Sequence, residues 1–173
     1  MNLRSLYIKP SESPIPSHLR GIEYWEKQRA DRIAPRWSDI SLLDFDPAII
    51  PFINVMDIDP RDNIARYRFW GTGLTETFDR DYTNAEVQQL AHSGVKNAAL
   101  AGLEKAIEEK QPNCEVREFL RSTGLVGRQI ILRLPLSDDG DTINRTVNLC
   151  YHEMGRANQS TAMFFEKVLA REG

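Results

Sequence analysis

The side chains that could carry chemistry in this 173-residue chain are few, and their spacing suits no common reaction. The three histidines, His18, His92 and His152, lie too far apart in the sequence for a metal-ligand motif, and we expect each to be solvated or to cap a backbone end. Cys114 and Cys150 are isolated thiols that we expect to be reduced and half-buried. No nucleophile elbow, Walker loop, dinucleotide-binding loop or H-E-x-x-H motif occurs. The sequence therefore predicts no metal site and no catalytic residue.

One acid–base pair has to be weighed, because a small isomerase or dehydratase of α+β fold would need such a pair inside a pocket. His152 and Asp141 are the candidates, but strand alternation places them on opposite faces. The acidic run of 57–63 is similar to a calcium loop, but it lacks the loop glycine and the downstream glutamate, so we expect a solvated hairpin turn. A protein that acts by binding is therefore a better expectation than an enzyme.

The composition bounds the class of protein. Apolar residues make up 41% and charged residues 27% of the chain, as in an ordinary globular protein. The net charge of −3 gives no electrostatic reason to expect nucleic acid as a partner. No stretch reaches the ~20 apolar residues of a membrane helix, and the proline-broken N-terminus lacks a secretory core. We therefore expect a cytoplasmic protein without a membrane span.

Periodic patterns predict the elements that must position these residues. We expect a mobile or loosely docked lead-in over 1–16 and a helix over His18–Arg32 that Ser17 caps. The next segments are two strands, short helical pieces, a long helix, three strands and a final helix: Ile49–Ile58, Ile64–Trp70, 72–90, Gly94–Lys110, Asn113–Arg121, Arg128–Leu136, Thr142–His152 and Asn158–Ala170. This order predicts an α+β fold with a five-stranded antiparallel sheet and helices on one face.

The second predicted strand opens the most informative block of the chain. Alternation puts three of its residues on each face: Tyr67, Phe69 and Gly71 on one, and Arg66, Arg68 and Trp70 on the other. The block reads R-Y-R-x-x-G-T, and it is followed by Arg80, Asp81 and Thr83. Upstream and downstream lie further short matches: Pro35, Arg36, Asp39, Ile40, Asp46, Pro47, Pro112, Leu134, Pro135, Leu136, Asp139 and Gly140. In this order and spacing, 19–151 resembles a bacterial family of short, stand-alone PAS-like sensor domains.

The resemblance implies a PAS-like domain over 34–155, with an N-terminal extension and flanking helix over 1–33 and a C-terminal helix over 156–173. It implies structural roles for six motif residues: Arg66, Arg68, Gly71, Thr72, Arg80 and Asp81. The family often has glycine where this chain has Asp79 and Asn84. Because Asp and Asn tolerate a left-handed backbone, we expect both turns to survive.

The PAS resemblance also implies a spatial strand order of second, first, fifth, fourth, third. Cys114 on the third strand and Cys150 on the fifth would then lie ~9–10 Å apart, too far for a disulfide. The long helix of such folds often flanks a ligand pocket, so His92, just before it, is a candidate haem or pocket residue. A flavin photosensor would need a cysteine in a helical motif, whereas both cysteines fall on predicted strands. The cofactor is left unknown.

The function that the resemblance implies is a non-catalytic sensor. It would bind a small apolar or amphipathic ligand between the sheet and the long helix, and signal to an unknown protein partner. Eight residues are expected to line that pocket: Tyr67, Phe69, Leu74, Phe78, Leu90, Leu103, Leu132 and Leu149.

The alternative is a ligand-free dimerisation or adaptor module. Trp70, Phe119 and Ile131 are expected on the outer face of the sheet, where an apolar patch needs a cover. The helix stripe of Leu19, Ile22 and Trp25 could cover it from the same chain or from a second subunit. We expect a homodimer in which this helix takes part.

Overall fold

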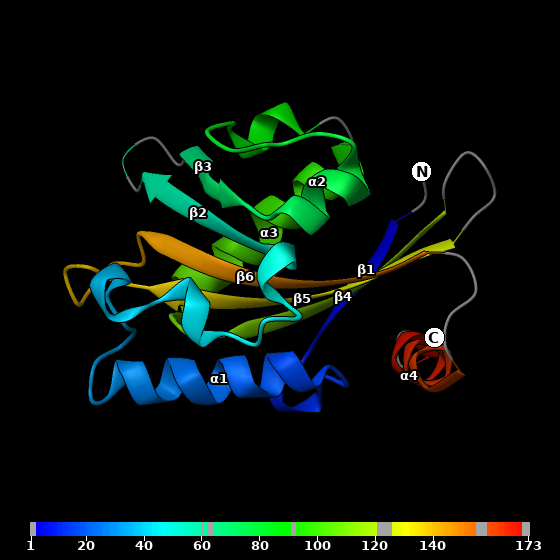
Figure 1. Ribbon diagram of the computed structural model, residues 1–173, viewed down its shortest axis with the longest axis horizontal. Helices are drawn as coiled ribbons and strands as arrows, with labels where there is room; N and C mark the ends of the chain where they lie inside the picture. Colours follow the sequence, from blue (N-terminus) through cyan, green and yellow to red (C-terminus); the bar gives the residue numbers. More distant parts are fainter. Residues whose placement is uncertain are drawn as a thin grey trace.

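The computed structural model describes residues 3–59, 61, 64–90, 93–120, 126–154 and 159–170 (Figure 1). Its strands are β1 Leu3–Ile8, β2 Ile53–Asp59, β3 Ile64–Trp70, β4 Asn113–Leu120, β5 Val126–Leu136 and β6 Arg145–Met154. Its α-helices are α1 Pro16–Arg29, α2 Thr72–Phe78, α3 Ser93–Glu109 and α4 Gln159–Leu169. Short 3-10 helices join them: η1 Pro10–Glu12, η2 Trp37–Asp39, η3 Leu42–Asp44, η4 Ile50–Phe52 and η5 Val87–Gln89. None of the described helices is long and apolar enough to cross a membrane.

The strands form one antiparallel sheet in the order β1-β4-β5-β6-β2-β3. The α+β class is confirmed. Without β1, the order β3-β2-β6-β5-β4 is the predicted PAS-like order of second, first, fifth, fourth, third. The predicted strand number of five is wrong, because β1 adds a sixth strand at the edge of the sheet beside β4.

Strand β1 corrects the expectation of a loosely docked N-terminus. Its register with β4 runs from Leu3 opposite Phe119 to Ile8 opposite Cys114. In the fold, Pro10 begins η1, and Pro16 occupies the first turn of α1, where a missing N–H costs nothing. The predicted extension 1–33 thus contains strand β1, which joins the sheet, and helix α1, which packs on it.

Helices cover both faces of the sheet, because the N-terminal flanking helix packs on the face opposite the long helix. Helix α1 crosses the first face, where Trp25 Nε1 donates a hydrogen bond to the Pro135 carbonyl at 2.7 Å. Helix α3 crosses the second face, where Gly102 lies against the Arg133 guanidinium. Figure 1 shows α1 below the strands and α2 above them. We call the two sides of the sheet the α1 face and the α3 face.

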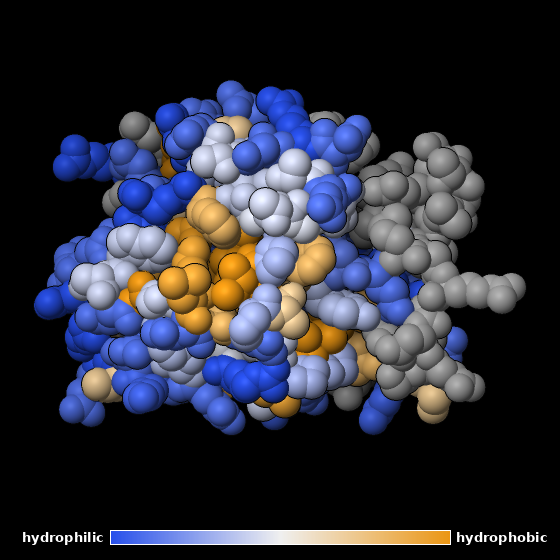
Figure 2. Space-filling view, in the orientation of Figure 1, coloured by the Kyte–Doolittle hydropathy of each residue, from blue (hydrophilic) through white to orange (hydrophobic). Residues whose placement is uncertain are grey.

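The α1 face carries the apolar core of the sheet. A Cβ placed on Gly21 of α1 would lie 2.8 Å from Leu149 and 3.8 Å from Leu132, so this helix approaches the strands closely. The buried side chains of this face are Ile53, Val55, Cys114, Val116, Ile130, Leu132, Leu134, Leu136, Val147 and Leu149. Trp25 is 0% exposed among them. The face of the molecule in Figure 2 is largely hydrophilic, and its largest apolar area lies near the centre of the view, between the positions of α1 and α2 in Figure 1.

Candidate functional site

A β-bulge builds the aromatic wall of the candidate site. The register of β2 with β3 shifts between Val55 and Met56, so that Asn54 lies opposite Trp70 while Met56 lies opposite Tyr67. The extra residue brings Tyr67 and Trp70 to the same face, with ring centroids 4.8 Å apart at an interplanar angle of 79°. The prediction that they lie on opposite faces is wrong, because a bulge breaks strict alternation.

The bulged strand places these rings beside a cavity of about 40 Å³ between the α3 face and the helices α2 and α3. A water molecule needs ~10–15 Å³ of such space, so the cavity has room for about three. Drug-sized ligands and large cofactors occupy ~300–1,000 Å³. The lining residues are Asn54, Met56, Tyr67, Trp70, Leu74, Phe78, Leu90, Val95, Ala99, Arg117, Gln129, Ile131, Arg133, Asn148, Cys150 and His152. The site is therefore small and partly polar.

Four of these lining residues carry a buried polar atom without a hydrogen-bond partner: Trp70 Nε1, Gln129 Oε1, Asn148 Oδ1 and His152 Nε2. The opposite ends of the two amides are engaged. Gln129 Nε2 lies 2.9 Å from His152 Nδ1, and Asn148 Nδ2 donates to Asn54 Oδ1 at 2.7 Å. A buried polar group without a partner costs about 1–3 kcal/mol, and native proteins contain few of them. Four of these atoms lie on the lining of one cavity.

Two arginines bring positive charge to the cavity wall. Arg117 makes a bidentate contact with Glu115, at 2.5 Å from Nε and 2.7 Å from Nη2. Arg133 Nη2 lies 2.8 Å from the same carboxylate. These three side chains are at most 3% exposed. Burial alone would raise the pKa of Glu115, but the charges of Arg133 and Arg117 lower it, so the group is an anion between two cations.

Burial shifts the pKa values of three titratable groups of the cavity toward the uncharged form. Burial, followed by the Arg117 charge, lowers the pKa of His152 to about 4, so its ring is neutral at neutral pH. Burial raises the pKa of the Cys150 thiol to about 12, and it also raises the pKa of Tyr67. A thiol in that state is a poor nucleophile. At neutral pH both the His152 imidazole and the Cys150 thiol are therefore uncharged.

The predicted pocket residues divide between the two faces. Tyr67, Leu74, Phe78 and Leu90 line the cavity, and their contact with a ligand stays a prediction. Leu132 and Leu149 point to α1 instead, and Phe69 is paired with Val55 of that face, so their predicted position is wrong. Leu103 is buried in α3 but does not line the cavity. The alternation of β5 and β6 was predicted correctly, but their apolar side was assigned to the wrong helix.

Sequence reasoning missed the polar residues of the cavity wall. Arg117, Gln129, Arg133, Asn148 and Asn54 occupy alternate positions of four neighbouring strands. Such a polar series reads as a solvent-facing side. The available signal was the long helix rich in alanine and glycine, which needs a sheet face to cover.

The motif residues have local structural contacts. Arg66 pairs with Glu86 at 2.9 Å, Thr72 begins α2, Arg80 lies over the Tyr82 ring, and Asp81 accepts from the Thr83 N–H. A Cβ on Gly71 would lie 2.2 Å from the Pro51 carbonyl oxygen, so only glycine fits there. Asp79 and Asn84 have φ of 54° and 66°, which confirms the predicted left-handed turns.

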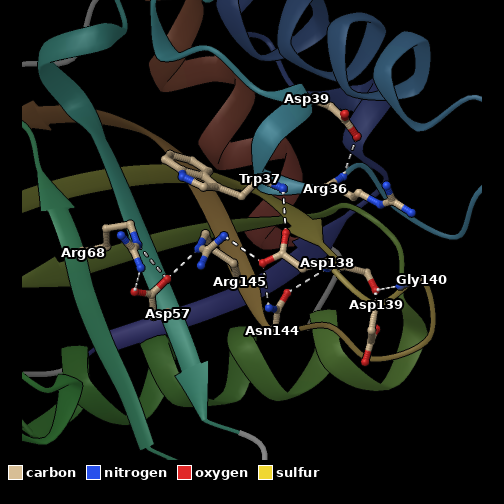
Figure 3. Close-up of polar contacts among 11 residues, drawn as sticks. Arg36, Trp37, Asp39, Asp57, Arg68, Asp138, Asp139, Gly140, Asn144 and Arg145 are labelled. Atoms are coloured by element: carbon tan, nitrogen blue, oxygen red, sulfur yellow. Dashed lines mark hydrogen bonds and ion pairs between the residues drawn. The ribbon is translucent and has the colours of Figure 1, made fainter.

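Arg68 belongs to an ion-pair network at one end of the sheet (Figure 3). It pairs with Asp57, which Arg145 also contacts, and Arg145 reaches Asp138 at 3.2 Å. Asp138 accepts a hydrogen bond from the Trp37 N–H at 2.9 Å. These contacts join β2, β3 and β6 to η2. The network therefore ties the loop segment before β2 to the sheet.

The histidines and cysteines differ from expectation. His18 is fully buried, not solvated, and its Nδ1 lies 2.9 Å from Ser13 Oγ. His92 lies outside the described residues. Cys114 and Cys150 are both buried, not half-buried, and both are free, as predicted. They lie on opposite faces, because Cys114 is opposite Leu132 while Cys150 is opposite Ile131.

The face that was expected to need a dimer partner is covered. Trp70 and Ile131 line the cavity and do not form an outer patch, and the side chain of Phe119 lies outside the described residues. Trp25 is buried within its own chain. The reason for placing α1 in a dimer interface is therefore removed.

Comparisons with known proteins place few limits on this site. No protein-family model matches the chain, and a search of curated proteins found no match. A solved structure described as an RNA-binding light-oxygen-voltage receptor aligns over 87% of this chain with 11% identity and a TM-score of 0.42. The alignment spans 38% of the length of that receptor. A similarity of this extent says nothing of RNA or of light for this chain.

Proposed function

We propose that this chain is a non-catalytic, PAS-like sensory domain that binds a small ligand in the cavity of the α3 face. The observation that carries the proposal is the set of four buried, unpaired polar atoms on the lining residues Trp70, Gln129, Asn148 and His152. A ligand with polar groups would supply the missing hydrogen bonds. Binding would then stabilise the folded state and fix the helices against the sheet.

The chemistry of the lining supports binding over turnover. Among the described lining residues there is no carboxylate to work with His152. Asp141, its predicted partner, is exposed, and its side chain contacts Lys110. General acid–base catalysis needs two positioned groups with suitable pKa values. The cavity offers a neutral imidazole with a pKa of about 4 and two arginines.

The ligand we propose is smaller and more polar than the apolar or amphipathic molecule that the sequence suggested. Because the cavity holds about three water molecules, the ligand can have only about three to six non-hydrogen atoms. A flavin or a haem would need the helices to move away from the sheet.

The signal would pass through α3. This helix carries Val95 and Ala99 on the cavity wall and Gly102 against Arg133, so a bound ligand and the buried arginines both contact it. A protein partner that reads the position of α3 completes the proposed mechanism. The cytoplasmic location, the homodimer and the absence of a nucleic-acid partner stay predictions from the sequence.

Two variants that replace an alanine of α3 by leucine test the proposal. Ala99→Leu fills the cavity, whereas Ala101→Leu adds the same volume on the solvent side of the same helix. Saturation-transfer NMR with a library of compounds of up to about six non-hydrogen atoms is the measurement. We expect compounds that bind the wild type and Ala101→Leu but not Ala99→Leu. Binding that survives Ala99→Leu, or a library without any binder, contradicts the proposed function.

A further inference from the structure

Building on the proposed ligand cavity, we infer that its ligand is a small carboxylate anion with a hydroxyl group, held by Arg117 and Arg133. Bicarbonate and glycolate both have this chemistry, a carboxylate head and one O–H donor. The inference rests on three observations: the charge of the cavity wall, the count of hydrogen-bond donors, and the position of the unpaired acceptors.

The charge of the wall favours an anion. Two arginines and one glutamate form the buried cluster, which leaves one positive charge in excess. Both arginines line the cavity, whereas Glu115 does not, and no other acidic residue is among the described lining residues. An uncompensated buried charge is strongly unfavourable. A monovalent anion in the cavity would neutralise the cluster.

Hydrogen-bond donors are in excess at the same place. Each guanidinium carries five N–H donors, whereas the two oxygens of Glu115 accept two hydrogen bonds from Arg117 and make one ion pair with Arg133. Asn113 Oδ1 accepts one more from Arg133, at 3.4 Å. Trp70 Nε1 is a further donor without a partner. A carboxylate is the acceptor that suits planar guanidinium groups best.

His152 adds another donor to this set. Its Nδ1 faces Gln129 Nε2, which can only donate, so Nδ1 is the acceptor and the neutral ring carries its proton on Nε2. That N–H is also buried without a partner. The imidazole therefore presents a donor, as Trp70 does.

The unpaired acceptors call for a hydroxyl. Gln129 and Asn148 use their amide N–H groups within the protein, so Oε1 and Oδ1 are left to accept. A bare carboxylate such as acetate has no donor for them. Bicarbonate and glycolate each have one O–H, and they contain four and five non-hydrogen atoms, within the roughly three to six allowed by the cavity.

Calorimetric titration of the full chain tests the inference. The titrants, at pH 8, are the sodium salts of bicarbonate, glycolate and acetate, and the neutral compound glycolamide. Sodium gluconate, whose anion is too large for the cavity, keeps the ionic strength constant. We expect saturable binding of bicarbonate or glycolate. The compound that binds more tightly shows which of these two anions the cavity prefers. Acetate should bind roughly tenfold more weakly, since one hydrogen bond is lost, and glycolamide at least tenfold more weakly, since the charge is lost.

Variants locate the binding. Arg117→Met leaves Glu115 paired with Arg133 alone and should abolish saturable binding, whereas Arg68→Met removes a charge outside the cavity and should leave it intact. If Arg117→Met does not fold, Trp70→Phe removes one donor and should weaken binding roughly tenfold. Equal losses in Arg117→Met and Arg68→Met would overturn the inference.

The outcomes separate this inference from the proposed function. Binding of glycolamide in preference to glycolate and bicarbonate would overturn the anion and leave a ligand-binding cavity in place. Absence of any binding by these four compounds would also overturn the anion, while the Ala99→Leu and Ala101→Leu screen decides the proposed function.

Discussion

A buried cluster of charged side chains lies on the α3 face of the sheet, formed by Glu115, Arg117 and Arg133. Tyr7 of β1 lies opposite Glu115, so the added edge strand covers a carboxylate that would otherwise be near the sheet edge. Within the cluster, both oxygens of Glu115 are bonded, which offsets part of the cost of its burial. The cluster gives the cavity its charge, so it belongs to the site as well as to the fold.

His18 is expected to make the fold sensitive to acid. Burial lowers its pKa from 6.5 to about 4. The unfolded chain therefore binds more protons than the folded chain in this window, and stability is full above about pH 6.5 and falls as the pH falls toward 4. The unfolding free energy of the wild type should decrease by about 2 kcal/mol from this group between pH 7.5 and 5.

Urea unfolding of His18→Gln at the two pH values checks the claim. The variant cannot take up a proton there, so its loss of stability over this interval should be smaller than that of the wild type by about 2 kcal/mol. Above pH 5, ordinary carboxylates contribute little. Equal losses in the two proteins would show that His18 is not buried in the neutral form.

The residues on each face of β5 and β6 could be predicted from the sequence, but the helix that each face meets could not. Leu132 and Leu149 were correctly placed on one face, because strand side chains alternate. Whether that face met the long helix or the N-terminal helix depended on tertiary packing, since an apolar series fits either. Trp70 was misplaced by a bulge, which leaves no clear mark in a single sequence.

At the scale of elements, α3 and the sheet approach each other through Gly102. A Cβ at this position would lie 2.2 Å from Arg133 Cζ, in the middle of a guanidinium that also contacts Glu115 and Asn113. Because Arg133 is fixed by these contacts, Gly102→Ala should destabilise the fold by about 1–3 kcal/mol in spite of the better helix propensity of alanine.

Denaturant unfolding measures this effect, with Glu104→Ala on the exposed side of α3 as the control, expected to change stability by less than about 0.5 kcal/mol. Gly102→Ala should also weaken binding of the proposed anion, because the added methyl group displaces the Arg133 guanidinium. A stabilised Gly102→Ala protein would mean that α3 lies farther from Arg133 than the 2.2 Å approach of a Cβ at Gly102 requires.

Element order was predictable to a large extent. The hairpin, the long helix and the meander of three strands follow from periodicity and turn residues, and the predicted long helix Gly94–Lys110 differs from α3, Ser93–Glu109, by one residue at each end. Strand β1 was not predicted, because six residues followed by prolines give little periodic signal. Its stability depends on pairing with β4, which is distant in sequence.

At the scale of the whole molecule, the chain has a PAS-like strand order with different contents on the two sides of its sheet. The α1 face is an apolar core closed by Trp25, and the α3 face encloses a small polar cavity. The apolar core and the proposed ligand site thus lie on opposite faces of the sheet. Changes at the cavity can therefore be made while the larger apolar core holds the fold together.

The indole N–H signals of the three tryptophans test this account most directly, in a ¹H–¹⁵N correlation spectrum recorded during titration with sodium glycolate or bicarbonate. Trp70 Nε1 is unpaired beside the cavity, whereas Trp25 Nε1 is bonded to Pro135 and the Trp37 ring lies 5.1 Å from the Arg145 guanidinium in the distant network. Trp70→Phe assigns the signal. We predict a saturable shift of the Trp70 signal while the other two stay in place. A Trp70 signal that does not move, or three signals that move together in proportion to salt, would contradict the account.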